Sequence, residues 1–260
     1  MKDQLLRRLI APFPPDSIFR RIGKRLCRGL SARQKFYHGV IYFDAVSQSW
    51  ALKGTPYETV DTELKDELLS LSRGCRHFID IGCNIGLITL SLLLRNQEIN
   101  AVCVDPNARV LRLLKKSLRA NHLEHRALLK NVAVGNEAGV VHFTSEISEM
   151  GHISSDGYKV ECLRLADLIN EYSSQPCLAK MDVEGFETIL LQGLEQFRNL
   201  RNLCLVVELH ALGYNQGNPA ECVKLLQQSG ATLRLLNGLP VSSLDPSQIT
   251  QIIARWKLCD

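Results

Sequence analysis

The residues whose types and spacing suggest chemistry most directly lie at positions 78–86, FIDIGCNIG. An apolar segment ends at Asp80, and a turn containing Gly82, Asn84 and Gly86 precedes an apolar, helix-like stretch. A strand, a glycine-rich turn and a helix start form the nucleotide site of open α/β sheets. The G-x-x-x-G spacing differs from the G-x-G-x-x-G of dinucleotide sites, and the Asp80 carboxylate would repel a pyrophosphate. The pattern therefore disfavours an NAD-type oxidoreductase and suits S-adenosylmethionine, whose sulfonium and ammonium groups are cationic.

A second carboxylate, Asp105, ends the next apolar segment, 25 residues after Asp80. In nucleotide-binding folds, a carboxylate at this place accepts hydrogen bonds from the two ribose hydroxyls. Because Asp105 precedes Pro106, the alternative is an N-cap ahead of a helix, but the glycine turn upstream favours the ribose role. Asn131 and Ala133, near the end of the third apolar segment, complete the predicted cofactor contacts.

Polar residues also end the later apolar segments, where ligands of open α/β sheets bind. We expect Asp182 beside the methionine end of the cofactor, with Glu184 or His210 as the base or as the group that orients the acceptor. Glu208, two residues before His210 on a strand, shares one side of the sheet with it. Methyl transfer to a hydroxyl requires in-line alignment and removal of a proton. Two alternatives remain: Glu184 as a helix-start residue and His210 as an ordinary surface histidine.

Asp182, Glu184 and His210 are also of the types that bind a divalent cation, but their spacing matches no firm metal pattern. We therefore predict no metal. The polar stretch 145–158, which contains His152, Ser154 and Ser155, is expected to be a loop of the acceptor pocket.

Apolar segments alternate with helix-like segments along the chain. This alternation predicts an α/β fold with a mostly parallel, doubly wound sheet and an antiparallel last strand. The expected strands are the segment ending at Asp80 and residues 100–104, 128–134, 139–144, 159–165, 177–182, 203–209, 232–236 and 249–258. Four helices are expected. The first begins at residue 87, and the others occupy residues 109–121, 186–193 and roughly 219–230.

Composition places the chain among folded domains of moderate size, with 260 residues, of which 45% are hydrophobic and 22% charged. The nine cysteines are scattered and form no C-x-x-C pair, which indicates reduced thiols rather than a disulfide framework or a zinc site. We expect a cytoplasmic protein, because no apolar run approaches the ~20 residues that span a bilayer and the N-terminus lacks the apolar region of a secretory signal.

Charge is unevenly distributed. Residues 1–35 contain ten basic and two acidic side chains, whereas the remainder contains 21 basic and 25 acidic side chains. We interpret residues 1–56 as a basic N-terminal arm and lead-in, and residues 57–260 as the S-adenosylmethionine-binding domain. Apolar residues recur every fourth position at 18, 22, 26 and 30, which predicts an amphipathic helix. This helix either packs on the domain or binds an anionic membrane surface, so that the protein would be peripheral to the membrane.

The chain also resembles the FkbM-like methyltransferases. The similarity extends from about residue 57 to residue 210, and its most specific part is KMDVEGFE. The matching motifs are FIDIGCNIG (78–86), DP (105–106), NVAVGNEAG (131–139), LRLADL (163–168), KMDVEGFE (180–187) and VVELH (206–210), in the order of the family. Three departures are Cys83 in place of a small alanine, Asp105 in place of the commoner glutamate, and Ala166 before Asp167, where the family usually has an acidic pair. The resemblance implies a class I, Rossmann-like methyltransferase that methylates a hydroxyl, often on a sugar or a secondary metabolite.

These observations predict an S-adenosylmethionine-dependent O-methyltransferase acting on a sugar, a glycolipid or a secondary metabolite. The alternatives are a methyltransferase of RNA or another macromolecule, and a cofactor-binding domain without turnover. The acidic composition after residue 35, and the absence of an aromatic-rich basic stretch in the sequence, disfavour a nucleic-acid partner.

Overall fold

A computed structural model describes residues 30–44, 51, 54–144, 152–153 and 157–256. The amphipathic helix expected in the arm and most of the expected loop at 145–158 lie outside these ranges. Among the described residues, no helix is both long and apolar enough to cross a membrane.

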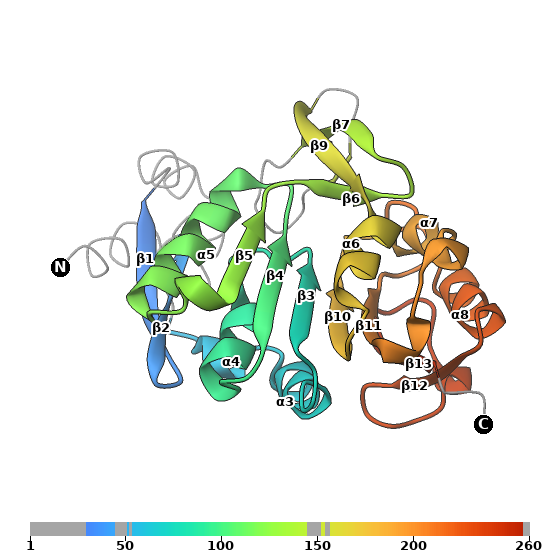
Figure 1. Ribbon diagram of the computed structural model, residues 1–260, viewed down its shortest axis with the longest axis horizontal. Coiled ribbons are helices and arrows are strands. Elements are labelled where there is room, and N and C mark those ends of the chain that lie inside the picture. Colours follow the sequence, from blue (N-terminus) through green and yellow to red (C-terminus); the bar gives the residue numbers. More distant parts are fainter. Residues whose placement is uncertain (1–29, 45–50, 52–53, 145–151, 154–156, 257–260) are drawn as a thin grey trace.

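The central sheet has seven strands in the order β12-β13-β11-β10-β3-β4-β5 (Figure 1). β3, β4, β5, β10 and β11 are parallel, whereas β13 runs antiparallel to both of its neighbours. The strands are β3 (His77–Ile81), β4 (Asn100–Val104), β5 (Ala127–Lys130), β10 (Cys177–Met181), β11 (Leu203–Leu209), β12 (Ala231–Leu235) and β13 (Thr250–Trp256). This order, in which the last strand of the chain, β13, is reversed between β12 and β11, confirms the predicted class I methyltransferase fold.

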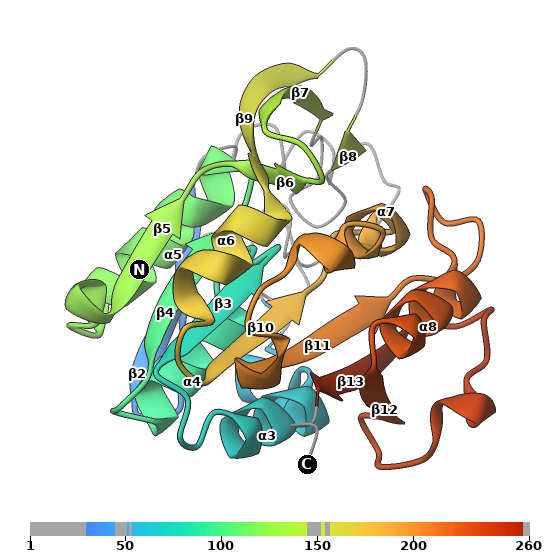
Figure 2. The ribbon, with the colours of Figure 1, turned by 45° about the vertical axis from the view of Figure 1, so that its right-hand side comes forward.

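Both faces of the sheet are covered by helices (Figures 1 and 2). Successive side chains of a strand point to opposite faces, and β11 follows this rule: Cys204 and Val206 pack into one core, and Leu205 and Val207 into the other. The first core includes α3, α4 and α5, and the second includes α6, α7 and α8. The helices are α3 (Thr62–Leu71), α4 (Leu87–Arg95), α5 (Ala108–Ala120), α6 (Leu165–Tyr172), α7 (Glu187–Leu191) and α8 (Pro219–Gln228).

The third strand differs from its prediction. Residues 128–134 belong to two sheets, because the chain leaves the central sheet after Lys130. The side-chain amide of Asn131, Nδ2, then donates to the backbone carbonyl of Asp105 at 2.9 Å, beside the end of β4. The second sheet has the order β6-β9-β7-β8 and lies beyond the carboxyl ends of β3, β4 and β5 (Figure 1). Its strands are β6 (Ala133–Gly135), β7 (Gly139–Thr144), β8 (His152–Ile153) and β9 (Tyr158–Arg164).

A hairpin, β1 (Ser31–Phe36) and β2 (Gly39–Asp44), packs against α5 and is absent from the sequence prediction. The backbone amide of Tyr42 donates to Ser117 Oγ at 2.8 Å, and that of Val40 donates to Asn121 Oδ1 at 2.9 Å. Two helices, α3 and α6, were also not predicted. The sequence motif LRLADL contains the start of α6, where strand-like and helix-like residues follow one another without a break.

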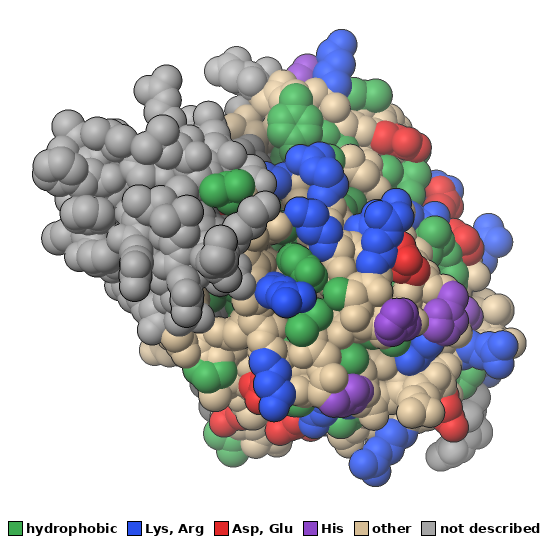
Figure 3. Space-filling model, turned by 90° about the vertical axis from the view of Figure 1, so that its left-hand side faces the viewer, with side chains coloured by type: hydrophobic (Ala, Val, Ile, Leu, Met, Phe, Trp, Pro, Cys, Tyr) green, Lys and Arg blue, Asp and Glu red, His purple; other side chains and the backbone are tan. Residues whose placement is uncertain are grey.

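The exposed side of α5 is basic, although the chain after residue 35 has more acidic than basic residues. Arg112, Lys115, Lys116 and Arg119 are exposed on α5, and Arg33 and Lys35 are exposed on the adjacent β1. Figure 3 shows Lys and Arg side chains distributed across this side of the molecule.

Candidate active site

The turn after β3 lies against two neighbouring strand ends. The backbone amides of Gly82 and Cys83 donate to Val104 O at 2.9 and 3.2 Å, and the amide of Asp182 donates to Ile81 O at 3.0 Å. Gly82 has φ 78°, and a Cβ atom there would lie 1.8 Å from the carbonyl oxygen of Asp182. Only glycine fits both this conformation and this contact. The turn is thereby held directly beside Asp182.

Gly86 is the second required glycine of the turn. It has φ 83° and immediately precedes α4. A Cβ atom at Gly86 would lie 2.2 Å from Leu114 Cδ1 of α5. The two glycines of the G-x-x-x-G pattern therefore bring the turn close to the loop after β10 and to α5, respectively.

Asp80 is buried beneath this turn, with 1% of its surface exposed. Thr89 Oγ1 donates to Asp80 Oδ2 at 2.6 Å, whereas Asp80 Oδ1 has no hydrogen-bond partner among the described residues. Burial raises the pKa of Asp80, and the nearby Lys180 ammonium opposes that rise. When ionised, Asp80 adds negative charge below the turn, where it would attract a sulfonium or an ammonium group.

Asp105 lies at the end of β4, next to the same turn. Its Oδ2 accepts from the amide of Asn84 at 2.9 Å, and its Oδ1 accepts from the amide of Asn107 at 2.8 Å. Burial raises the pKa of Asp105 to about 7, against these two hydrogen bonds, and the charges of Asp80 and Asp182 contribute to the rise. Each carboxylate oxygen retains acceptor capacity for a hydroxyl group.

The N-cap alternative for Asp105 is not what the structure shows. Asn107 is the N-cap of α5, and its side chain accepts from the amide of Arg109 at 3.0 Å. Asn131 is exposed beside Asp105, and Ala133 is buried in β6 of the second sheet. The predicted cofactor residues of the first three strands thus gather around one turn, with Ala133 on the adjoining sheet.

On the other side of the turn, Lys180 is a buried cation within the apolar strand β10. It lies opposite Asp80 in the register of β10 and β3. Its Nζ donates to Asp182 Oδ2 at 2.9 Å. Burial alone would lower the pKa of Lys180, but the carboxylates of Asp182, Asp80 and Glu208 raise it above its ordinary value. Lys180 therefore stays charged and links the cofactor side of the site to Asp182.

His210 is held by an acid on each side of its ring. Its Nδ1 lies 3.0 Å from Glu187 Oε1, and its Nε2 lies 3.4 Å from Glu184 Oε2 and 3.9 Å from Asp182 Oδ1. Burial would lower the pKa of His210, but the hydrogen bonds with Glu184 and Glu187 and the neighbouring carboxylates raise it to about 10. The ring of Tyr214 stacks on the imidazole with centroids 5.2 Å apart. His210 is 4% exposed, so it is not an ordinary surface histidine.

Glu187 fixes the loop that carries Asp182 and Glu184. Its Oε1 accepts from the backbone amides of Val183 and Gly185 at 3.2 and 3.1 Å, in addition to its contact with His210. The Glu187 side chain is 1% exposed. A carboxylate that bonds two loop amides and an imidazole holds all three in one arrangement.

Glu184 adopts a left-handed backbone conformation, with φ 55°. Tyr214 Oη donates to Glu184 Oε2 at 3.0 Å, and the side-chain amide of Asn215 donates to the Glu184 carbonyl. The helix-start alternative assigned to Glu184 applies instead to Glu187, because α7 begins there. Positive φ in a residue other than glycine is strained and is maintained only by its surroundings. Here the contacts with Tyr214 and Asn215 maintain it.

The structure groups a different set of residues for a divalent cation than the sequence analysis considered. Oxygen and nitrogen atoms of Asp182, Glu208 and His210 lie within 4.8 Å of one another, so that Glu208 takes the place of Glu184 in that group. Glu208 Oε2 accepts from Gln251 at 2.7 Å, and burial raises the pKa of Glu208. Asp182 already contacts Lys180. A divalent cation would have to compete with these existing interactions.

Three residues of this cluster were not assigned a role from the sequence: Lys180, Glu187 and Tyr214. Lys180 and Glu187 lie inside the motif KMDVEGFE, and a lysine within an otherwise apolar strand was the available signal. Tyr214 follows β11 in a loop, and only the folded chain brings it to His210. By contrast, the sequence analysis did name Asp182, Glu184, Glu208 and His210, and these four side chains lie close together in the structure.

Comparisons with known proteins give one family match and several distant similarities to solved structures. Residues 64–142 match the model of the methyltransferase small domain family. No curated protein matches the chain. Similar solved structures include the precorrin-6y C5,15-methyltransferase from Geobacter metallireducens (10% identity, 76% of this chain and 90% of that chain, TM-score 0.47). Another is a SAM-dependent methyltransferase from Agrobacterium tumefaciens (10% identity, 88% of this chain and 70% of that chain, TM-score 0.47). A third is an O-methyltransferase from Bacillus cereus in complex with SAH (11% identity, 80% of this chain and 86% of that chain, TM-score 0.43).

These structural similarities are too distant to indicate a substrate. The family match and the strand order are independent of them, and both agree with the glycine turn in indicating S-adenosylmethionine as the cofactor. The chain therefore combines the class I methyltransferase fold with a match, over residues 64–142, to the methyltransferase small domain family.

Proposed function

We propose that this chain is an FkbM-like O-methyltransferase that transfers a methyl group to a hydroxyl of a sugar, a glycolipid or a secondary metabolite. The observation that carries the proposal is the cluster of Asp182, Glu184 and His210, directly beside the turn that contains Gly82. A cationic methyl donor and a hydroxyl acceptor both require negative charge at this place, the first for binding and the second for loss of its proton.

The cofactor would lie across the carboxyl ends of β3 and β4. Gly82 and Gly86 leave room for close backbone approach, Asp105 would accept from the ribose hydroxyls, and Asp80 would attract the positive end. The unpartnered Asp80 Oδ1 fits this assignment, because a buried acceptor without a donor is costly unless a ligand compensates. When bound, S-adenosylmethionine supplies a methyl group on a positively charged sulfur.

Asp182 is our choice for the base. Its Oδ1 has no hydrogen-bond partner among the described residues, whereas Oδ2 is held by Lys180. The acceptor hydroxyl would donate to Oδ1. The Asp182 carboxylate would accept the hydroxyl proton while the acceptor oxygen takes up the methyl group that S-adenosylmethionine would supply, with S-adenosylhomocysteine as the leaving group. S-adenosylhomocysteine and the methyl ether are the products.

His210 is an orienting group in this proposal. With a pKa raised to about 10, the imidazole is already protonated at neutral pH and cannot accept the hydroxyl proton. Its positive charge instead offsets the repulsion among Asp182, Glu184 and Glu187. Glu184, whose carboxylate is shared with Tyr214 and His210, would orient the acceptor.

The test is transfer of a labelled methyl group to a panel of monosaccharides, glycolipids and phenolic metabolites, with total RNA as a further substrate. We expect label in an ether that survives alkali, and only background transfer with Asp182→Asn. The matched control is Asp167→Asn, which removes an exposed carboxylate paired with Arg164. Transfer to RNA, or to nitrogen, would contradict the proposal.

A further inference from the structure

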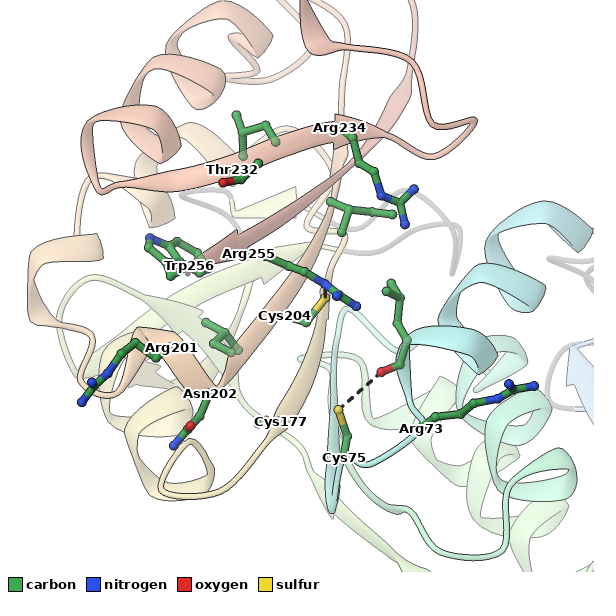
Figure 4. Close-up of a pocket in the computed structure, with 14 residues that line it drawn as sticks. Arg73, Cys75, Cys177, Arg201, Asn202, Cys204, Thr232, Arg234, Arg255 and Trp256 are labelled. Carbon is green, nitrogen blue, oxygen red and sulfur yellow. Dashed lines mark hydrogen bonds between the residues drawn. The ribbon is translucent and has the colours of Figure 1, made fainter. Parts of the chain in front are cut away.

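A second cavity lies at the opposite end of the central sheet from the methyltransferase site. It has a volume of about 540 Å³. It is bordered by the first residues of β10 and β11, by the last residue of β13 and by the end of α3 (Figure 4). Since β13 is antiparallel to β11, all these strand ends lie at the same edge of the sheet. The volume is in the range of pockets that hold small molecules.

The lining of this cavity is strongly basic. None of its fourteen lining residues is acidic. Four of them are arginines: Arg73, Arg201, Arg234 and Arg255. Arg234 and Arg255 point toward the gap between the sheet and the segment that carries Cys75, whereas Arg73 and Arg201 extend outward at its rim (Figure 4).

Among the described residues, only one of the four arginines has an acidic partner. Arg234 pairs with Glu67, which lies on α3. Within the described part of the chain, Arg73, Arg201 and Arg255 form no ion pair, and Arg255 donates from Nε to Cys204 Sγ at 3.4 Å. No described residue pairs with the guanidinium nitrogens at the tip of Arg255, so within the described part of the chain they can bind an anion.

The remaining lining is largely apolar. It comprises Leu71, Leu203, Leu233, Ile253, Trp256 and the thiols of Cys75, Cys177 and Cys204. Burial raises the pKa of Cys75 to about 11 and also raises the pKa of Cys204, so both thiols are neutral. The positive charges of Arg255 and Arg234 oppose the rise in the pKa of Cys204, and Arg255 Nε lies 3.4 Å from Cys204 Sγ.

We propose that this cavity binds a small organic anion, a phosphate or carboxylate attached to an apolar group. Arginine guanidinium groups bind such oxyanions in a bidentate manner, and Arg255 together with Arg234 would hold the charged end. The apolar group would contact Ile253 and Trp256. The site is separate from the cofactor site, so the two ligands bind without displacing each other.

The experiment is calorimetric titration of the full chain, saturated with S-adenosylhomocysteine, with phenyl phosphate, benzoate, inorganic phosphate and benzyl alcohol. Trp256 fluorescence in a Trp50→Phe background reports occupancy of the cavity itself. We expect phenyl phosphate or benzoate to bind, inorganic phosphate to bind more weakly and benzyl alcohol not to bind. Which of the two organic anions binds more tightly distinguishes a phosphate from a carboxylate ligand.

Arg255→Gln should weaken binding at least tenfold, and Arg112→Gln, which changes an exposed arginine on α5, should leave it unchanged. Retained melting temperature of both variants excludes unfolding as the cause. The proposal is overturned if no organic anion binds, or if Arg255→Gln binds as tightly as the wild type. It is also overturned if anion binding appears only when S-adenosylhomocysteine is omitted, because the ligand would then occupy the cofactor site.

Discussion

At the carboxyl ends of β3, β4, β10 and β11 the polar side chains are mostly acidic, whereas arginines line the cavity at the amino ends of β10 and β11. The acidic end has six carboxylates and two buried cations: Asp80, Asp105, Asp182, Glu184, Glu187 and Glu208, with Lys180 and His210. Of the four arginines that line the cavity at the other end, only Arg234 has an acidic partner among the described residues.

Because its two ends differ in charge, the central sheet would bind ligands of opposite charge at those ends. At the acidic end, loops of several strands converge and backbone amides hold the carboxylates, as with Asn84 and Asn107 on Asp105. This hydrogen-bond network fixes the positions of the carboxylates, as catalysis by preorganised charges requires. At the basic end the guanidinium groups are exposed on long side chains, which suits binding rather than catalysis.

The largest effect is expected from Asp182→Asn. Losing the carboxylate that accepts the proton should lower the rate of methyl transfer by about 10³-fold, within the range for general-base groups. Binding of S-adenosylhomocysteine, measured by calorimetry, should change much less. A variant that retains wild-type turnover would remove Asp182 as the base and leave Glu184 as the candidate.

Gly82→Ala should be the most destabilising substitution at the turn. It combines a positive φ with a Cβ placed 1.8 Å from the Asp182 carbonyl oxygen, so we expect a loss of about 3 kcal/mol or more in the free energy of unfolding. Gly213→Ala is the matched control, because Gly213 has φ +84° but nothing within 4 Å of the added atom. It should cost only about 1 kcal/mol. Equal losses in urea denaturation would show that the turn does not lie against Asp182.

Asp105→Asn tests the ribose contact. A charged acceptor contributes about 1.5–3 kcal/mol per hydrogen bond, so affinity for S-adenosylhomocysteine should fall by about 10- to 100-fold. Asp66→Asn, which changes an exposed acid on α3, is the control. The phenyl phosphate site at the basic end should be unaffected by either variant. An unchanged dissociation constant for S-adenosylhomocysteine in Asp105→Asn would exclude the ribose role.

A pH dependence of stability is also expected from His210. Its pKa in the folded protein is raised to about 10 from an ordinary value of 6.5. The stabilisation is therefore fully present below pH 6.5 and is lost as the pH rises toward 10. The free energy of unfolding of the wild type should fall relative to that of His210→Gln across this interval. A constant difference between the two proteins would show that the imidazole is neutral in the folded state.

Much of the fold could be predicted because the strands of the central sheet are apolar segments that end in polar residues. The glycine turn and the positions of Asp80, Asp105 and Asp182 followed from the same pattern. The bend after Lys130 could not be predicted, since apolar residues lie on both sides of Lys130 and Asn131 and only the folded chain brings Asn131 to Asp105. The hairpin β1–β2 lies in a segment interpreted as part of a basic arm, and its pairing with α5 is a tertiary contact.

The catalytic side was less predictable. Sequence position alone could not show that Glu187 reaches back to Val183, Gly185 and His210, or that Lys180 lies between Asp80 and Asp182. The raised pKa of His210 depends on Asp182, Glu184 and Glu187, which follow β10 and lie against the residue after β11. That arrangement changes its proposed role from a base to an orienting cation.

The most direct test of the central claim, that the acidic end binds S-adenosylmethionine, is thermal unfolding of the wild type with S-adenosylhomocysteine and, in parallel, with NAD. At about 100 times the dissociation constant, a ligand adds roughly 2.7 kcal/mol, which should raise the Tm by about 5–10 °C for a chain of this size. We expect this shift with S-adenosylhomocysteine alone, and a smaller one with Asp105→Asn at the same concentration. A shift with NAD alone, or with neither ligand, would contradict the account.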